Sequence, residues 1–173
     1  GVKAAPAPTS SGLPAHAIAD QHIENTTHDY QLVATTADQQ ALADVLAQQP
    51  SFCFDTETTS IDANQAELVG ISFAYEPGKA YYVPIAEDKA AAQAVVAIFK
   101  PVLENQAIKK IAQNIKYDIL VLKRYDVEVA GEYLDTMVMH YLLEPELRHN
   151  MDYMAETYLS YKPISITSLI GKS

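Results

Sequence analysis

Apolar and polar residues alternate in the middle of the chain, and this alternation predicts strands. Turn sequences that contain Asn, Gly or Pro separate the alternating runs, as at residues 76–79, Glu-Pro-Gly-Lys. Connections this short favour neighbouring strands that run antiparallel. The three central strands are predicted at Ser51 to Glu57, Glu67 to Tyr75 and Ala80 to Pro84. An extended segment is expected before them, at about Asp29 to Ala34, and a short strand after them, at Ile108 to Ala112.

Apolar residues that recur every three or four positions predict helices around these strands. The first begins at Thr36, with Gln39 as its capping-box partner, and Pro50 stops it. Asn114 stands at the N-cap position of the helix after Ala112. The other helices are predicted at about Asp88 to Glu104, Asp135 to Glu144 and Met151 to Leu159. This order predicts an α/β domain with a mixed central sheet and helices packed on it.

The N-terminal stretch differs in composition from the rest of the chain. Residues 1–27 contain Ala-Pro-Ala-Pro-Thr-Ser-Ser-Gly-Leu-Pro and then a polar stretch without an apolar period, so we expect a linker or a weakly ordered lead-in there. Residues 28–173 suit a single domain, because domains typically span roughly 100 to 200 residues. The single cysteine, Cys53, lies between two phenylalanines of a predicted strand, which argues against a disulfide framework and suits a reducing cytosol.

Charge and hydropathy limit the classes of function. The sequence has no run of about 18 apolar residues and no secretory signal, so we expect a cytoplasmic protein without a membrane partner. The formal net charge of -10 argues against a module that holds nucleic acid by phosphate neutralisation alone. An acidic chain can still be a metal-dependent phosphodiesterase, because such an enzyme needs carboxylates at its centre.

Two carboxylates end the first central strand. Side chains alternate along a strand, so Asp55 and Glu57 project from the same face as Cys53. Like charges at neighbouring positions on one face are unfavourable unless a cation or protons compensate, and a divalent metal explains the pair. The alternative is that the strand ends at Phe54 and that both acids point into water.

A third acid, Asp118, lies in the first turn of the helix that follows Asn114. It stands three residues after Ile115 and four before Leu122, at the edge of the apolar face, so it is expected to point toward the sheet. The alternative is that Asp118 serves only the helix dipole, which favours an acid in a first turn.

The residues around these acids resemble the proofreading domain of bacterial DNA polymerase I, a 3'-5' exonuclease of the DEDD superfamily. Residues 55–58, Asp-Thr-Glu-Thr, are similar to its first exonuclease motif, and residues 114–118, Asn-Ile-Lys-Tyr-Asp, to its second. Residues 68–74, 135–137 and 148–152 also resemble that family at matching places. The resemblance covers about residues 28–173 and implies a ribonuclease H-like exonuclease fold.

The resemblance also implies a chemistry and a substrate. Two divalent ions, Mg or Mn, would serve hydrolysis of the last phosphodiester at a single-stranded or frayed DNA 3' end. Asp55 would bridge both ions, Glu57 would bind the first and help to orient the attacking water, and Asp118 would hold the second through water. Ligands that are all oxygen suit Mg or Mn better than Zn. A polymerase domain in the same parent chain is the implied partner.

Contacts to the DNA end are carried over from the same family. Ile61 would wedge against the terminal base, and Tyr117 would stack or bond near the terminal nucleotides. Each such residue also has an ordinary structural interpretation, for example Asn114 as a helix cap and Met151 as core. The implied DNA contacts are Thr58, Ile61, Gln113, Asn114, Tyr117, Arg148 and Met151. The five histidines show no paired metal-ligand spacing and receive no role.

The sequence departs from the family in its third motif, a Tyr followed four residues later by an Asp. No such pair occurs after Asp118: Tyr153 is followed at that distance by Thr157, and Tyr158 by Lys162. We therefore expect that residues 28–173 are a C-terminally incomplete exonuclease domain, truncated before the third motif, and that this chain digests DNA weakly or not at all. Two alternatives stay open. One is an exonuclease-like module that binds no metal and serves as a spacer beside a polymerase, and the other is an RNA 3' exonuclease of the same superfamily.

Overall fold

A computed structural model describes residues 19–165 and 168 of the chain. Its contacts divide into two compact units. The first is Thr27–Met151, and the second joins the described residues before Thr27 to those from Asp152 onward. Most of the predicted N-terminal lead-in, residues 1–18, lies outside the described residues. Within the second unit, Gln21 pairs with Tyr161 in an isolated parallel bridge.

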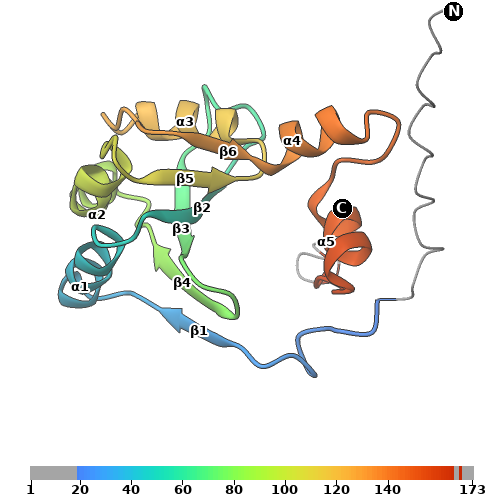
Figure 1. The fold of residues 1–173 in the computed structure, drawn as a ribbon. Coiled ribbons are helices and arrows are strands. Elements are labelled where there is room, and N and C mark those ends of the chain that lie inside the picture. The colour runs from blue at the N-terminus through green and yellow to red at the C-terminus, as the bar shows by residue number, and fades with distance from the viewer. Residues whose placement is uncertain (1–18, 166–167, 169–173) are drawn as a thin grey trace, which may run out of the picture. The chain divides into compact units, whose positions relative to one another are not determined.

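The first unit is built on a six-stranded mixed sheet (Figure 1). Its central strands β2, β3 and β4 form the predicted antiparallel meander, while β1 pairs parallel with β4, and β5 pairs parallel with β2 and β6. The order across the sheet is β1-β4-β3-β2-β5-β6. The strand bounds are β1 Asp29–Leu32, β2 Ser51–Thr58, β3 Leu68–Ala74, β4 Lys79–Pro84, β5 Lys109–Ala112 and β6 Tyr133–Asp135. Periodicity did not predict β6, because three residues are too few to show an alternation.

Helices form at all five predicted places, with bounds α1 Thr36–Leu46, α2 Lys89–Leu103, α3 Ile115–Lys123, α4 Thr136–Leu143 and α5 Met151–Leu159. The predicted capping box of α1 is wrong by one residue. Thr35 is the N-cap and accepts a hydrogen bond from the Asp38 backbone N–H, while the Gln39 side chain is buried and donates to the carbonyls of Val33 and Ala34. No residue of α5 is buried.

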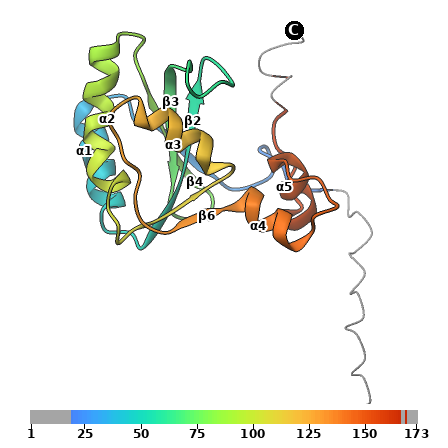
Figure 2. The same cartoon turned by 90° about the horizontal axis from the view of Figure 1, so that it is seen from above.

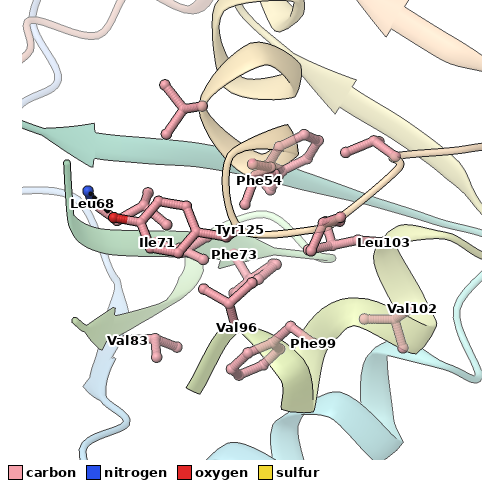
Figure 3. Packing of buried hydrophobic residues seen from close by; sticks show 14 of the residues in the cluster. Phe54, Leu68, Ile71, Phe73, Val83, Val96, Phe99, Val102, Leu103 and Tyr125 are labelled. Atoms are coloured by element: carbon pink, nitrogen blue, oxygen red, sulfur yellow. Dashed lines mark hydrogen bonds between the residues drawn. The ribbon is translucent and has the colours of Figure 1, made fainter. Parts of the chain in front are cut away.

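The hydrophobic core lies against one face of the sheet, under α1, α2 and α3 (Figures 2 and 3). Phe52 and Phe54 of β2 alternate with the exposed Cys53, so β2 places its aromatic residues in the core and leaves its other face open. Phe73 of β3 stacks on Phe99 of α2, with ring centroids 4.9 Å apart. Such an arrangement fixes β2 and β3 to the helices and determines which face carries the acids.

Two buried polar groups support this core. The backbone N–H of Leu68 donates to the Tyr125 hydroxyl at 3.0 Å (Figure 3). That hydroxyl donates to Glu67 at 2.7 Å. Lys110 of β5 is fully buried, and its ammonium donates to the carbonyl oxygen of Ile108 at 2.9 Å. Among the residues that the structure describes, no helix combines the length and the apolar character needed to cross a membrane.

Candidate active site

The two acids of β2 lie on the open face of the sheet. Residues 51–58 alternate between buried and more exposed side chains, and Asp55 and Glu57 share the exposed set with Cys53. The ladder pairs Asp55 with Ser72 of β3 and Glu57 with Gly70. The strand continues to Thr58, so the alternative in which it ends at Phe54 is wrong. Both carboxylates therefore stand on paired positions of the same strand face, and the register shifts directly after Glu57.

Asp118 points toward the sheet, as predicted from its place on α3. It is buried, with 2% of its surface exposed, and its oxygen Oδ1 accepts hydrogen bonds from Thr56 of β2. The Thr56 hydroxyl donates at 2.6 Å and its backbone N–H at 3.0 Å. The hydrogen-bonded pairing between β2 and β5 ends at Cys53, so β5 offers no acceptor to the backbone N–H of Thr56. The Asp118 carboxylate accepts from this N–H instead. A role limited to the helix dipole does not account for these bonds.

The electrostatics of Asp55 couple the three acids. Burial, followed by the charges of Asp118 and then Glu57, raises the pKa of Asp55 from 3.8 to about 6. Burial also raises the pKa of Asp118, while the hydrogen bonds from Thr56 act in the opposite direction. A carboxyl whose ionisation is opposed by burial and by two neighbouring carboxylates lies in a field that favours a cation.

The described residues provide no cation for this field. Their ion pairs include none of Asp55, Glu57 and Asp118. Within residues 19–165 and 168, no three His, Cys, Asp or Glu side chains are gathered so as to hold a metal ion as they stand. The donors themselves suit a hard divalent ion, because all are carboxylate oxygens and positive charge would relieve their repulsion.

Four of the implied DNA-contacting residues surround one hollow beside these acids. The hollow has a volume of about 550 Å³ and lies between the end of β2 and the start of α3. The Thr58 and Tyr117 hydroxyls lie 2.6 Å apart, and Tyr117 also donates to the Ser60 carbonyl. The Ile61 side chain is 99% exposed at the rim. The hollow is lined by Thr58, Thr59, Ser60, Ile61, Asn114 and Tyr117.

Asn114 enters this hollow in an unusual conformation. It occupies the predicted N-cap position of α3, but its φ of 62° is left-handed and its side chain makes no capping bond. The expectation that the Asn114 side chain caps α3 is therefore wrong. Its oxygen Oδ1 is buried and has no hydrogen-bond partner among the described residues. A buried amide oxygen without a partner is rare, so this acceptor is free for a donor that enters the hollow.

The other three implied contacts are arranged differently. The Gln113 amide donates to the His149 carbonyl at 2.7 Å and accepts from the Thr136 hydroxyl, so both ends of this side chain are bonded within the protein. Gln113 therefore ties the segment of Arg148 and His149 to the end of β5. Arg148 is exposed, and Met151 is 54% exposed, so a core role for Met151 is wrong. Neither Arg148 nor Met151 lines the hollow.

Two residues beside the acids had no predicted role. Asp135 ends β6, and its carboxylate accepts hydrogen bonds from backbone N–H groups of both α3 and α4. The Tyr82 hydroxyl lies where a Cβ on Gly70 would be, 2.2 Å from that position. Gly70 of β3 pairs with Glu57, so the Tyr82 side chain, which reaches over Gly70 from β4, stands beside Glu57. The family resemblance at residues 135–137 was the only sequence signal that included Asp135. No pattern in the neighbouring sequence indicated a role for Tyr82.

Comparisons with known proteins show the family of this chain. A family model described as 3'-5' exonuclease matches residues 30–173. DNA polymerase I of Pseudomonas aeruginosa is 39% identical over 153 residues, which are 83% of this chain and 17% of that protein. The chain thus spans about a sixth of the length of this curated relative.

Two solved structures share the fold at low sequence identity. The catalytic core of RRP6 from Trypanosoma brucei has a TM-score of 0.66 at 17% identity and covers 83% of this chain and 38% of its own. RNase D of Escherichia coli, an exoribonuclease involved in structured RNA processing, has a TM-score of 0.61 at 17% identity over 75% of this chain and 33% of its own. The fold is ribonuclease H-like, and the chain belongs to the 3'-5' exonuclease family as a domain of the DNA polymerase I type.

Proposed function

We propose that this domain removes nucleotides from DNA 3' ends by metal-dependent hydrolysis of the terminal phosphodiester. The observation that carries the proposal is the shared electrostatic field of the three acids. Burial and the charges of Asp118 and Glu57 together raise the pKa of Asp55, and no cation of the described residues relieves them. Neighbouring carboxylates that oppose one another's ionisation suit a divalent cation, because the cation relieves their repulsion.

The residues divide the work by their positions. Asp55 and Glu57, on the open face of β2, would hold the metal directly, and Asp118, bonded to Thr56, would act on the second ion through water. When bound, two Mg or Mn ions supply an activated water and stabilise the leaving 3' oxygen. Ionised carboxylates are the form that binds a cation. Asp55 with a pKa of about 6 is ionised above neutral pH, so we expect metal affinity to fall on acidification through that value.

The hollow beside the acids would receive the terminal nucleotide. Ile61 is fully exposed at its rim, where an apolar side chain can press against a base. The Thr58 and Tyr117 hydroxyls and the free Asn114 oxygen provide polar groups for sugar or backbone. Gln113 would contribute indirectly, since both ends of its amide are bonded within the protein. Arg148 and Met151 lie outside the hollow, where they would contact nucleotides further along the strand.

The larger protein would contain a polymerase domain beside this one, because the sequence relatives are DNA polymerase I and this chain spans only 17% of the first of them. Proofreading is the function that such an arrangement supports. Likeness to RNase D concerns the fold alone at 17% identity, so the sequence relatives favour DNA over RNA as substrate.

Metal binding is the sharpest test, because it does not depend on turnover. Mn titrated into the chain, with free Mn followed by electron paramagnetic resonance, should show saturable binding that Asp55→Asn weakens at least tenfold. Glu87→Gln, an exposed acid outside the site, is the matched control and should bind Mn like the unmodified chain. Absence of saturable binding to the unmodified chain would leave the inert spacer module as the better explanation.

A digestion assay then distinguishes DNA from RNA as the substrate. With 5'-labelled DNA and RNA strands of the same sequence and Mn present, we expect weak shortening from the 3' end of the DNA, because the third motif is not found after Asp118, and none in Asp55→Asn. Preferential shortening of the RNA strand would refute DNA as the substrate and favour an RNA 3' exonuclease.

A further inference from the structure

The Asp135 carboxylate forms hydrogen bonds with the starts of two helices, α3 and α4. Its oxygen Oδ1 accepts from the backbone N–H groups of Met137 at 2.9 Å and Val138 at 3.2 Å, which is ordinary N-capping of α4. The same carboxylate accepts from Asn114 at 3.1 Å and from Ile115 at 3.0 Å, twenty or more residues earlier. One side chain thus satisfies four backbone donors at the starts of α3 and α4.

The bonds to α3 matter because α3 has no cap of its own. The residue at its N-cap position, Asn114, makes no side-chain capping bond and is left-handed with a φ of 62°. A residue with a Cβ adopts this conformation at a cost in energy and keeps it only when its surroundings hold it there. The Asp135 carboxylate provides that hold, since it bonds the N–H of Asn114 and of the residue after it.

The first turn of α3 is the part of the helix that faces the hollow. Asn114 and Tyr117 line the hollow, and the Asn114 oxygen Oδ1 is buried without a hydrogen-bond partner among the described residues. Asp118 is different, because Thr56 of β2 holds it through two bonds of its own. A change at Asp135 should therefore disturb the groups proposed to contact DNA more than the acids proposed to contact metal.

We propose that Asp135 is a positioning residue, which sets the first turn of α3 so that Asn114 and Tyr117 are placed for the DNA end. This inference rests on the proposed function of the hollow. Thr136 assists at the next position, because its hydroxyl donates to the Ala112 carbonyl at 3.3 Å and to the Gln113 amide oxygen. The end of β6 and the end of β5 are thereby linked through side chains just before α3 begins.

A variant with a shorter side chain at residue 135 can keep the cap of α4 while it loses a bond to α3. In Asp135→Ser, a short hydroxyl can still cap α4, because Ser is a favoured N-cap residue, but it lacks the second oxygen, Oδ2, which accepts from the Ile115 N–H of α3. The matched control is Asp88→Ser at the N-cap of α2, where Asp88 accepts from the Ala91 N–H at 2.9 Å. Both variants replace a capping Asp by Ser, and only the first one removes the bond between Oδ2 and the Ile115 N–H of α3.

Binding of a fluorescent oligothymidylate, measured by anisotropy with Ca present to suppress cleavage, should be about tenfold weaker for Asp135→Ser than for Asp88→Ser. Mn affinity should stay within about twofold of the unmodified chain in both variants, since Asp118 keeps its bonds to Thr56. If Asp135 had a purely structural role, its replacement would lower stability without weakening oligothymidylate binding more than Mn binding. Equal oligothymidylate affinity of the two variants would overturn the inference.

Backbone amide exchange provides a readout that does not depend on DNA. Residues 114–117 should exchange faster in Asp135→Ser than in Asp88→Ser, while α4 keeps its protection. Equal exchange at residues 114–117 would also overturn the inference. If the unmodified chain binds no oligothymidylate, the proposed role of the hollow fails, and exchange alone then decides whether Asp135 sets the start of α3.

Discussion

Replacing Asp55 by Asn should stabilise the metal-free protein, although it removes a residue proposed to act in the site. Burial and the charges of Asp118 and Glu57 raise the pKa of Asp55 from 3.8 to about 6. A carboxyl with a raised pKa in the folded state contributes stability below its ordinary pKa and loses it as the pH rises through the folded value. Above about pH 6, the ionised Asp55 therefore lowers the free energy of unfolding, and Asn removes this effect.

The size of the gain follows from the two pKa values. The difference between 3.8 and about 6 corresponds to about 3 kcal/mol, at roughly 1.36 kcal/mol per pH unit. Asp55 is only partly buried, so solvent screening reduces this upper limit, and we expect about 1 to 2 kcal/mol at pH 7.5. At pH 4.5 the gain should be smaller, because most of the Asp55 carboxyl is then protonated in the folded protein.

Urea unfolding with EDTA at both pH values measures the gain, with Glu87→Gln as the control for removing one negative charge from an exposed position. Mn should then reverse the order, since it stabilises the unmodified chain by binding the folded state and has less affinity for Asp55→Asn. The reasoning would be refuted if Asp55→Asn were no more stable than Glu87→Gln at pH 7.5, or if its gain were the same at pH 4.5.

Two further predictions concern the sheet. Gly70→Ala should lower the free energy of unfolding by about 1 to 3 kcal/mol in urea, because its Cβ would lie 2.2 Å from the Tyr82 hydroxyl. The loss should shrink in a Tyr82→Ala background, and an unchanged loss there would contradict the steric explanation. Burial lowers the pKa of Lys110 to about 8, so the stability linked to this residue is lost as the pH falls through that value. Unfolding free energies should therefore rise from pH 8 to pH 10, less steeply in Lys110→Met, and parallel slopes would argue against this linkage.

Local patterns in the sequence determined much of the fold. Alternation in residues 51–57 was enough to place Asp55 and Glu57 on one face, because neighbouring side chains of a strand must point to opposite sides. Helical spacing around Asp118 was enough to turn it toward the sheet, where its buried position confirms the prediction. The short turns between β2, β3 and β4 likewise predicted an antiparallel meander, because a short turn joins strands that are neighbours and run in opposite directions. Each of these results depends on residues a few positions apart.

Only the tertiary structure decided how the site is held together. Thr56 and Asp118 are 62 residues apart, and Asp135 reaches α3 across 20, so no local period reports either bond. The pKa of Asp55 depends on which charges the packing of sheet and helices brings near it. The Gln113 side chain forms its hydrogen bonds with Thr136 and His149, which belong to other segments of the chain. Periodicity records which face a residue presents, whereas partners, burial and electrostatic coupling depend on the segments that pack against that face.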